Sequence, residues 1–270
     1  MNTIFLFIGF LKFPLFLKRF SFDINFIRGE EWVFLQQFLE SHNRLESLHI
    51  HIREKPSNKS HYSHRNIYLQ NLLRSLKNQS FLRDLTLETS FCSLESFSIG
   101  LSHLPVMKNQ LHTFKFRAID DTVTSQKMPH KRINGVCEFI KNQKKSLRRL
   151  QIAIPFVFED KIVTKIACAI SKLTQLKILD LQIQDINTKK TEGIQRYFDE
   201  KIQKDYLSIN SAEDQAWKPT LAQYMPRLKN LEDFLFRIGL SDLYKKEDHQ
   251  WFLDLIKALS SLKRLRTVFI

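Results

Sequence analysis

The stretch LKILDLQI, residues 176–183, contains a pattern that recurs along the chain. From Leu179 to Ile183 every second residue is apolar, and successive side chains of a strand point to opposite faces. The apolar side chains of this stretch therefore share one face of a predicted β-strand. The pattern reads L-x-x-L-x-L-x-I, with Phe, Ile or Val replacing some members elsewhere. Its other occurrences begin at Leu17, Leu45, Leu82, Leu111, Leu147, Leu231 and Leu265.

The first residues of successive blocks are 28, 37, 29, 36, 29, 55 and 34 positions apart. Between the blocks the apolar period changes to that of a helix, because 133–140 and 163–170 place apolar residues at i, i+3, i+4 and i+7. A strand and helix of about 30 residues cannot bury their own apolar faces, so each unit must stack on its neighbours. The sequence therefore predicts an α/β solenoid with one parallel sheet.

The chain resembles the leucine-rich repeat family, in particular the long strand-helix repeats of the ribonuclease-inhibitor type. The stretch LKILDLQIQDINTKKTEGIQRYF (176–198) carries the likeness best, with support from KSLRRLQIAI (145–154), EDKIVTKIACAISKL (159–173) and HQWFLDLIKALSSLKRL (249–265). The resemblance implies a single horseshoe-shaped solenoid over residues 1–270, with about eight or nine repeats. Its parallel sheet would line the concave side, and its helices would cover the convex side.

The sequence departs from the family in the turn that follows each strand. The family has an Asn eight residues after the first Leu of the pattern, where it caps backbone groups of that turn. In six of the eight blocks this position holds Arg53, Ser90, Ile119, Pro155, Gln184 and Gly239. Because no ladder of Asn side chains can form, we expect irregular turns and a less uniform solenoid.

The longer intervals contain additional segments. A degenerate strand at 206–209 would divide the 55-residue interval into two repeats, and this is the interpretation we favour. The alternative is an insertion with extra helices, since Ser211-x-x-Asp214 resembles a capping box and Pro219 follows it. The polar stretches 53–64 and 120–132 are expected to protrude as loops between a strand and its helix.

The two ends of the chain both lack a polar capping repeat. The apolar run before Lys12 is far shorter than the roughly 20 residues that span a bilayer, so no membrane span is expected. We expect residues 1–16 to form the helix of a partial first repeat, with a targeting segment as the alternative. Uncapped ends of a solenoid expose its core, which predicts a piece of a longer array or end-to-end contacts with a partner.

Composition and spacing indicate a non-enzymatic protein without a cofactor or metal. The six glycines are never closer than 20 residues to one another, which excludes GxGxxG, phosphate-loop and GxSxG motifs. Cys92, Cys137 and Cys168 are too widely spaced for a metal motif. Cys137 and Cys168 lie in apolar helical contexts and are expected to be buried free thiols, which fits an intracellular, cytoplasmic location. Five of the nine histidines lie between His42 and His64, and His49 and His51 share a strand face, but no Cys is near and any further metal ligands would have to come from a flexible loop.

The residues between the apolar positions of each strand point to the opposite face of the sheet. This band is polar and mixed in charge, which suits the recognition of a folded protein. We therefore expect a scaffold, adaptor or regulatory subunit that binds another protein through the concave face. The central candidates are Asp84, Thr86, Glu88, Thr113, Lys115, Arg117, Arg149, Gln151, Asp180, Gln182, Asp233 and Arg237.

The formal net charge of +14 favours one alternative function, the binding of RNA or another anionic surface. The predicted concave face balances its charges, so the excess of cations lies elsewhere, chiefly in the basic flank 127–149. Such a run is also typical of a solvated helix face. The candidates in this flank are Lys127, Lys131, Arg132, Lys141, Lys144, Lys145 and Arg148.

Overall fold

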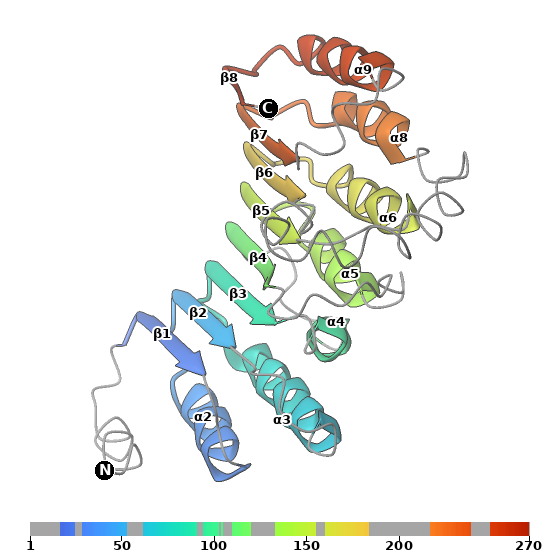
Figure 1. Cartoon of the computed structure of the whole chain (residues 1–270). Helices are drawn as coiled ribbons and strands as arrows, with labels where there is room; N and C mark the ends of the chain where they lie inside the picture. The colour runs from blue at the N-terminus through green and yellow to red at the C-terminus, as the bar shows by residue number, and fades with distance from the viewer. Residues whose placement is uncertain are drawn as a thin grey trace, which may run out of the picture.

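A computed structural model describes residues 17–24, 29–52, 62–90, 94–102, 104, 110–119, 133–154, 160–183, 217–238 and 249–269. Its strands form one open sheet of eight parallel strands in the order of the chain (Figure 1). The strands are β1 (Arg19–Ile24), β2 (Ser47–Ile52), β3 (Asp84–Ser90), β4 (Thr113–Ile119), β5 (Arg149–Ile154), β6 (Ile178–Ile183), β7 (Asp233–Ile238) and β8 (Thr267–Phe269).

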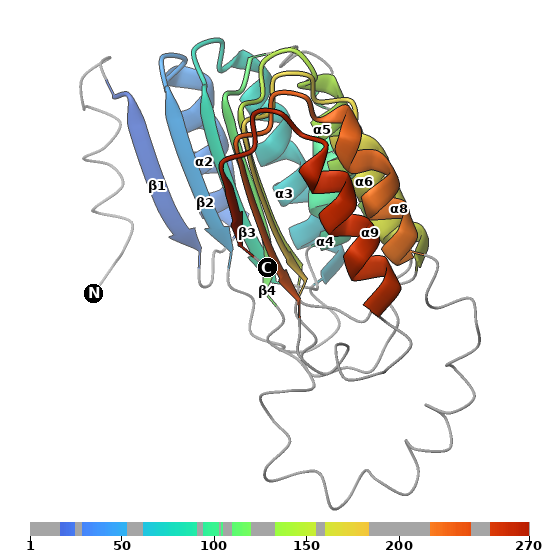
Figure 2. The same ribbon diagram turned by 90° about the horizontal axis from the view of Figure 1, so that it is seen from above.

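The α-helices of the described chain all cover the same face of this sheet (Figures 1 and 2). Each helix packs against the next one along the chain, and α6 packs against α8. The helices are α2 (Gly29–Ser41), α3 (Tyr62–Ser75), α4 (Leu94–Ser102), α5 (Asn134–Asn142), α6 (Asp160–Ile170), α8 (Trp217–Tyr224) and α9 (His249–Ser260). Two short 3-10 turns, Leu76–Asn78 and Met225–Arg227, extend α3 and α8.

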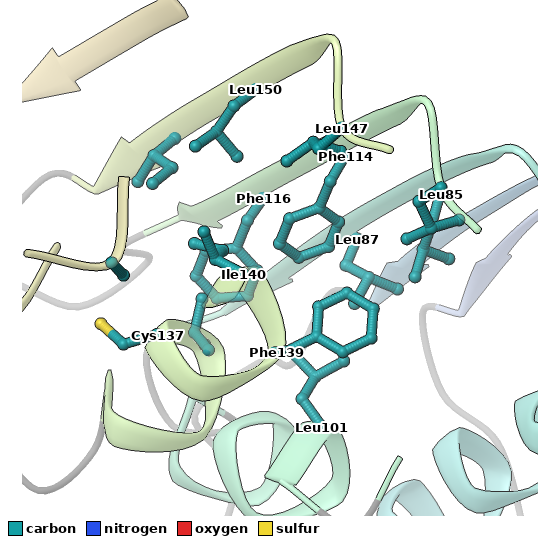
Figure 3. Packing of buried hydrophobic residues seen from close by; sticks show 14 of the residues in the cluster. Leu85, Leu87, Leu101, Phe114, Phe116, Cys137, Phe139, Ile140, Leu147 and Leu150 are labelled. Atoms are coloured by element: carbon teal, nitrogen blue, oxygen red, sulfur yellow. The ribbon is translucent and has the colours of Figure 1, made fainter. Parts of the chain in front are cut away.

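The apolar positions of the strand pattern build the core between the sheet and the helices. Phe114 and Phe116 of β4 are fully buried and point toward α5 (Figure 3). Phe139 of α5 meets Phe114 edge to face, with ring centroids 5.0 Å apart. Edge-to-face pairs of this kind add to the stabilisation that burial of the rings provides. Each core residue is thus packed between two layers that belong to different parts of one repeat.

The predicted strands and helices are confirmed where the structure describes them. All eight blocks of the pattern form strands, and both stretches with helical spacing lie on α5 and α6. Burial follows the predicted periodicity, since Ile133, Val136, Cys137 and Ile140 are all buried. The architecture is therefore a repeat-like α/β arrangement in which strand and helix alternate. No described helix is long and apolar enough to cross a bilayer.

The favoured interpretation of the 55-residue interval is wrong. β6 pairs directly with β7, with Ile178 opposite Asp233 and Ile183 opposite Ile238. A strand at 206–209 would have to lie between them in the sheet, and the pairing leaves no place for it. The alternative of an insertion agrees with this pairing. Pattern alone could not separate the two because Tyr-Leu-Ser-Ile satisfies the strand alternation only loosely.

Other predictions lie partly or wholly outside the described residues. These include the helix expected at 1–16 and the loop at 120–132. The loop expected at 53–64 is too long at its end, because residues 62–64 already belong to α3. Residues 206–209 themselves are also outside the described part of the chain.

The turns that lead from each helix into the next strand join neighbouring repeats through their backbones. The residue before the strand and the first strand residue donate their N–H groups to one carbonyl oxygen of the preceding repeat. At β5, for example, Arg148 N and Arg149 N lie 2.9 and 3.0 Å from His112 O. The same pair of hydrogen bonds recurs before every strand from β2 to β8. These bonds hold the strand starts in line, because each turn is anchored to the turn beside it.

Glutamine side chains reinforce three of these turns. Gln143 Oε1 accepts hydrogen bonds from Gln110 N and Leu111 N, both at 3.1 Å. Gln110 Nε2 donates to Gln79 O at 3.2 Å, and Gln79 Nε2 donates to Leu39 O. In the leucine-rich repeat family the corresponding Asn lies in the turn after each strand. The side-chain ladder of this protein lies in the opposite turn, before the strand.

Replacing Gln143 with leucine removes this acceptor while keeping an apolar side chain of similar size in the buried site. We expect Gln143→Leu to lower the free energy of unfolding by about 2–4 kcal/mol, because each buried N–H left without a partner costs about 1–3 kcal/mol. Urea unfolding followed by circular dichroism measures the change. Gln143→Glu, compared at about pH 4 where a buried carboxyl group is neutral, is the control, since its carbonyl oxygen can still accept both bonds. Equal losses for the two variants would show that the acceptor is not what matters.

Gly135 allows α5 to approach α4 closely. A Cβ atom at this position would lie 1.6 Å from Ser98 O, and Gly135 N donates to Ser98 Oγ at 2.7 Å. At Gly100, an added Cβ would instead meet the Leu73 side chain, 2.5 Å from its Cδ1 atom. A side chain can rotate away, whereas backbone atoms cannot move without shifting the helix.

We therefore expect Gly135→Ala to destabilise the protein by about 3 kcal/mol or more, as severe overpacking does. Gly100→Ala is the matched variant and should cost at least about 1 kcal/mol less. The midpoints of urea unfolding for both variants give this comparison. The packing of α5 on α4 as described would be incorrect if Gly135→Ala were as stable as the unchanged protein.

Candidate interaction surface

Three rows of residues cross the sheet on the face opposite the helices, and we call this surface the open sheet face. The strand register aligns one residue of each strand in each row. The first row is Arg19, Ser47, Asp84, Thr113, Arg149, Ile178, Asp233 and Thr267; the second is Ser21, His49, Thr86, Lys115, Gln151, Asp180, Leu235 and Phe269; the third is Asp23, His51, Glu88, Arg117, Ala153, Gln182 and Arg237.

All twelve residues predicted for the concave face lie in these rows. The structure therefore brings together positions from five strands, β3 to β7, that are far apart in the sequence. Arg237 is placed by its backbone register, opposite Gln182. The other predicted side chains are half-buried or exposed, in contrast to the buried apolar positions beside them.

No helix of the described chain covers the open sheet face (Figure 2). Parallel sheets are usually covered on both faces, because their strands tend to be apolar on both sides. Here the helix-free face is polar at most positions of the rows, so it tolerates contact with water. Three apolar side chains of the C-terminal strands interrupt this pattern, namely Ile178, Leu235 and the 58% exposed Phe269.

Histidines and carboxylates form a cluster at the N-terminal end of this face. His51 Nδ1 lies 3.4 Å from Asp23 Oδ2, and His51 Nε2 lies 3.8 Å from Glu88 Oε2. His49 Nε2 lies 3.7 Å from the other oxygen of Glu88. The two imidazole rings are nearly parallel, with centroids 6.4 Å apart. With neutral imidazoles this cluster carries the negative charge of its two carboxylates.

A basic band follows on β4 and β5. Lys115 is half-buried, whereas Arg117 and Arg149 are exposed. Glu88, which stands opposite Arg117 in the register, is instead directed to the two histidines. Within the described residues none of the three cations forms a salt bridge.

An acidic and amide-rich band lies on β6 and its neighbours. Gln151 Nε2 donates to Asp180 Oδ2 at 3.0 Å, and Gln182 Nε2 is 3.2 Å from the same oxygen. The two amides hold the carboxylate of Asp180 in one orientation. Asp233 stands one strand further along, in the first row. The charges of the open sheet face are therefore partly segregated by strand, with the cations of β4 and β5 between the carboxylates of β3 and that of β6, whereas Arg19 with Asp23 on β1 and Arg237 with Asp233 on β7 leave those strands without net charge.

The described residues offer little for metal binding or thiol chemistry. No group of three or more His, Cys, Asp or Glu side chains among them is arranged to hold a metal ion. Cys137 is a buried free thiol, as predicted, and Cys168 is free and half-buried. Burial raises the pKa of the Cys137 thiol to about 12. At neutral pH this thiol is protonated, which is the unreactive form.

The basic flank predicted at 127–149 divides between described and other residues. Lys127, Lys131 and Arg132 lie outside the described part of the chain. Lys141 is in the last turn of α5 and forms a salt bridge of 2.7 Å with Glu138, which raises the pKa of Lys141. The remaining three, Lys144, Lys145 and Arg148, are exposed in the turn before β5, which leads directly into Arg149 of the open sheet face.

Sequence reasoning identified the members of the open sheet face but missed their grouping. Equal numbers of acidic and basic residues suggested a mixed surface, whereas the register assembles them into bands. The neighbours across the strands could have been found from the sequence, because aligning the blocks by their first Leu places Lys115, Gln151 and Asp180 in one row. The hydrogen bonds that orient Asp180 could not be predicted from the alternation of apolar and polar residues in the strands.

No protein-family model matches this sequence, and no curated protein matches it either.

Proposed function

We propose that this protein is a leucine-rich-repeat-like scaffold, adaptor or regulatory subunit that binds another protein through its open sheet face. The finer description of the fold as a horseshoe with a concave sheet belongs to this proposal, as does an intracellular location. The proposal involves no chemical step. Binding would rest on complementary shape and charge spread over several repeats.

One observation carries the proposal, namely a parallel sheet of eight strands with one face free of described helices. A face of this size supplies far more contact area than a small-molecule site needs. Lys115, Gln151 and Asp180 occupy consecutive strands of one row, so a rigid sheet presents them at the spacing of about 4.8 Å between strands. Rigid presentation lowers the entropy cost of binding.

The arrangement of charges on the open sheet face indicates what charges the surface of the partner would carry. A basic band between two acidic ones fits a folded protein with a carboxylate-rich ridge flanked by cations. Charge complementarity of this kind selects among partners and sets their orientation. The exposed Phe269 and the half-buried Leu235 at the C-terminal strands add apolar contacts, which interfaces typically combine with polar ones.

The test is the triple variant Lys115→Glu, Arg117→Glu and Arg149→Glu, which reverses the basic band. We expect partner proteins captured from a lysate of the native cells to fall by at least about tenfold, equivalent to about 1.4 kcal/mol. Quantitative mass spectrometry with nuclease-treated lysate measures the loss. Circular dichroism and the urea midpoint should remain unchanged, because the three side chains make no salt bridge in the described structure.

The matched control is Lys144→Glu, Arg148→Glu and Lys172→Glu, which changes the net charge equally but lies in the turns before the strands. Capture should be retained by this variant. If both variants lose the same proteins, overall charge and not the open sheet face is responsible. If neither loses any, binding occurs elsewhere and the proposal fails.

A further inference from the structure

The turns that connect each helix to the next strand form a second surface, which we call the turn edge. Figure 2 shows these turns side by side along one edge of the sheet, and the backbone bonds between them keep them in register. Their described segments are 42–46, 76–83, 110–112, 143–148, 171–177, 225–232 and 261–266. Together these segments contain thirteen Lys and Arg residues but only two carboxylates, Glu46 and Glu232.

Both carboxylates are already paired with a lysine of the neighbouring repeat. Lys18 Nζ lies 2.8 Å from Glu46 Oε1, and Lys177 Nζ lies 2.7 Å from Glu232 Oε1. The hydrogen bond from Lys177 lowers the pKa of Glu232, and the charges of Arg266 and Arg264 contribute in the same direction. The remaining cations are exposed, and Lys144, Arg148 and Lys172 form no salt bridge within the described residues.

Helix dipoles account for only part of this charge. The C-terminal ends of the helices lie at the turn edge, and each carries the equivalent of about half a negative charge. The seven described helices therefore supply about −3.5 charges, which cations at these positions stabilise. The turn edge carries a net +11 from its side chains. Some of these cations also have neutral partners, since Arg83 donates to Gln110 O, Arg264 donates to Asn230 Oδ1 and Arg227 lies over the ring of Tyr224, but neutral partners do not balance the charge.

We infer that the turn edge binds the phosphates of a single-stranded nucleic acid. Cations recur in nearly every repeat along one line, and adjacent strands of a sheet are about 4.8 Å apart. A polyanion with regularly spaced charges can contact several repeats at once and release counterions from each contact. Contacts to phosphates carry no sequence information, so binding through these cations is expected to be independent of sequence.

The other side chains of the turn edge favour a single strand over other anions. Phe81, 52% exposed, lies in the turn between Lys77 and Arg83. An aromatic ring beside cations can stack on an unpaired base, whereas a duplex keeps its bases stacked internally. Phe81 is the only large apolar side chain among the exposed ones in the described turns, too little for insertion into a lipid surface.

The experiment measures binding of fluorescein-labelled oligo(U) and oligo(dT) of about 20 nucleotides by anisotropy over a range of salt concentrations. We expect both strands to bind the full chain, with a logarithmic salt dependence that reports the number of phosphate contacts. In Lys144→Glu, Arg148→Glu, Lys172→Glu the slope should fall by about 2, and binding should weaken at least about a hundredfold at about 0.1 M salt.

The control is the variant of the open sheet face with Lys115, Arg117 and Arg149 changed to Glu, which has the same net charge. It should bind within about twofold of the unchanged protein if the contacts are local. Equal loss in both variants, no binding by the unchanged protein, or stronger binding of duplex RNA or phosphatidylserine vesicles would each overturn the inference. If the triple variant does not fold, the single variants Lys144→Glu and Lys172→Glu test the same inference. Each should lower the slope of the logarithmic salt dependence by about 0.7.

Discussion

Each strand-helix unit of this protein can bury its apolar side chains only against the units beside it. A unit of about 30 residues has too little interior of its own, and its strand needs a partner on each side for its backbone groups. The parallel register from β1 to β8 meets both needs at once. The paired backbone bonds before each strand and the glutamine side chains of the turns hold that register at one edge. The stability of each repeat therefore depends on its contacts with the adjacent repeats.

This constraint also explains where function can reside. The helices occupy one face of the sheet because they must cover its apolar side, which leaves the other face and the turns free to vary. The exposed side chains there contribute little to the core, in contrast to buried turn residues such as Leu147 and Gln143, so their chemistry can be suited to a binding partner without loss of packing. The open sheet face presents charges in bands, and the turn edge presents a nearly unbroken line of cations. The two surfaces adjoin, because the first row of the open sheet face directly follows the turns of the turn edge.

Much of the fold could be predicted because its rule is local and repeated. The alternation in LKILDLQI and its relatives requires only that every second side chain face the core. The helical spacing at 133–140 needs only one buried stripe, and both patterns survive replacement of Leu by Phe, Ile or Val. The prediction of a degenerate strand at 206–209 failed for the same reason, because it too used only a local pattern. A short apolar alternation is common, and only the direct pairing of β6 with β7 excludes a strand between them.

The sequence by itself determined the eight strands, the helices that follow their spacing, the side of each strand that faces water and the sign of the overall charge. These properties depend on residue type and period alone. Only the tertiary structure decided which charges gather together. Lys144, Lys172 and Arg264 belong to different repeats, and their common edge arises because every helix returns to the sheet on the same side. Likewise, Gln143 supports the turn at Leu111 through a hydrogen bond across 32 positions, a distance over which local pattern carries no information.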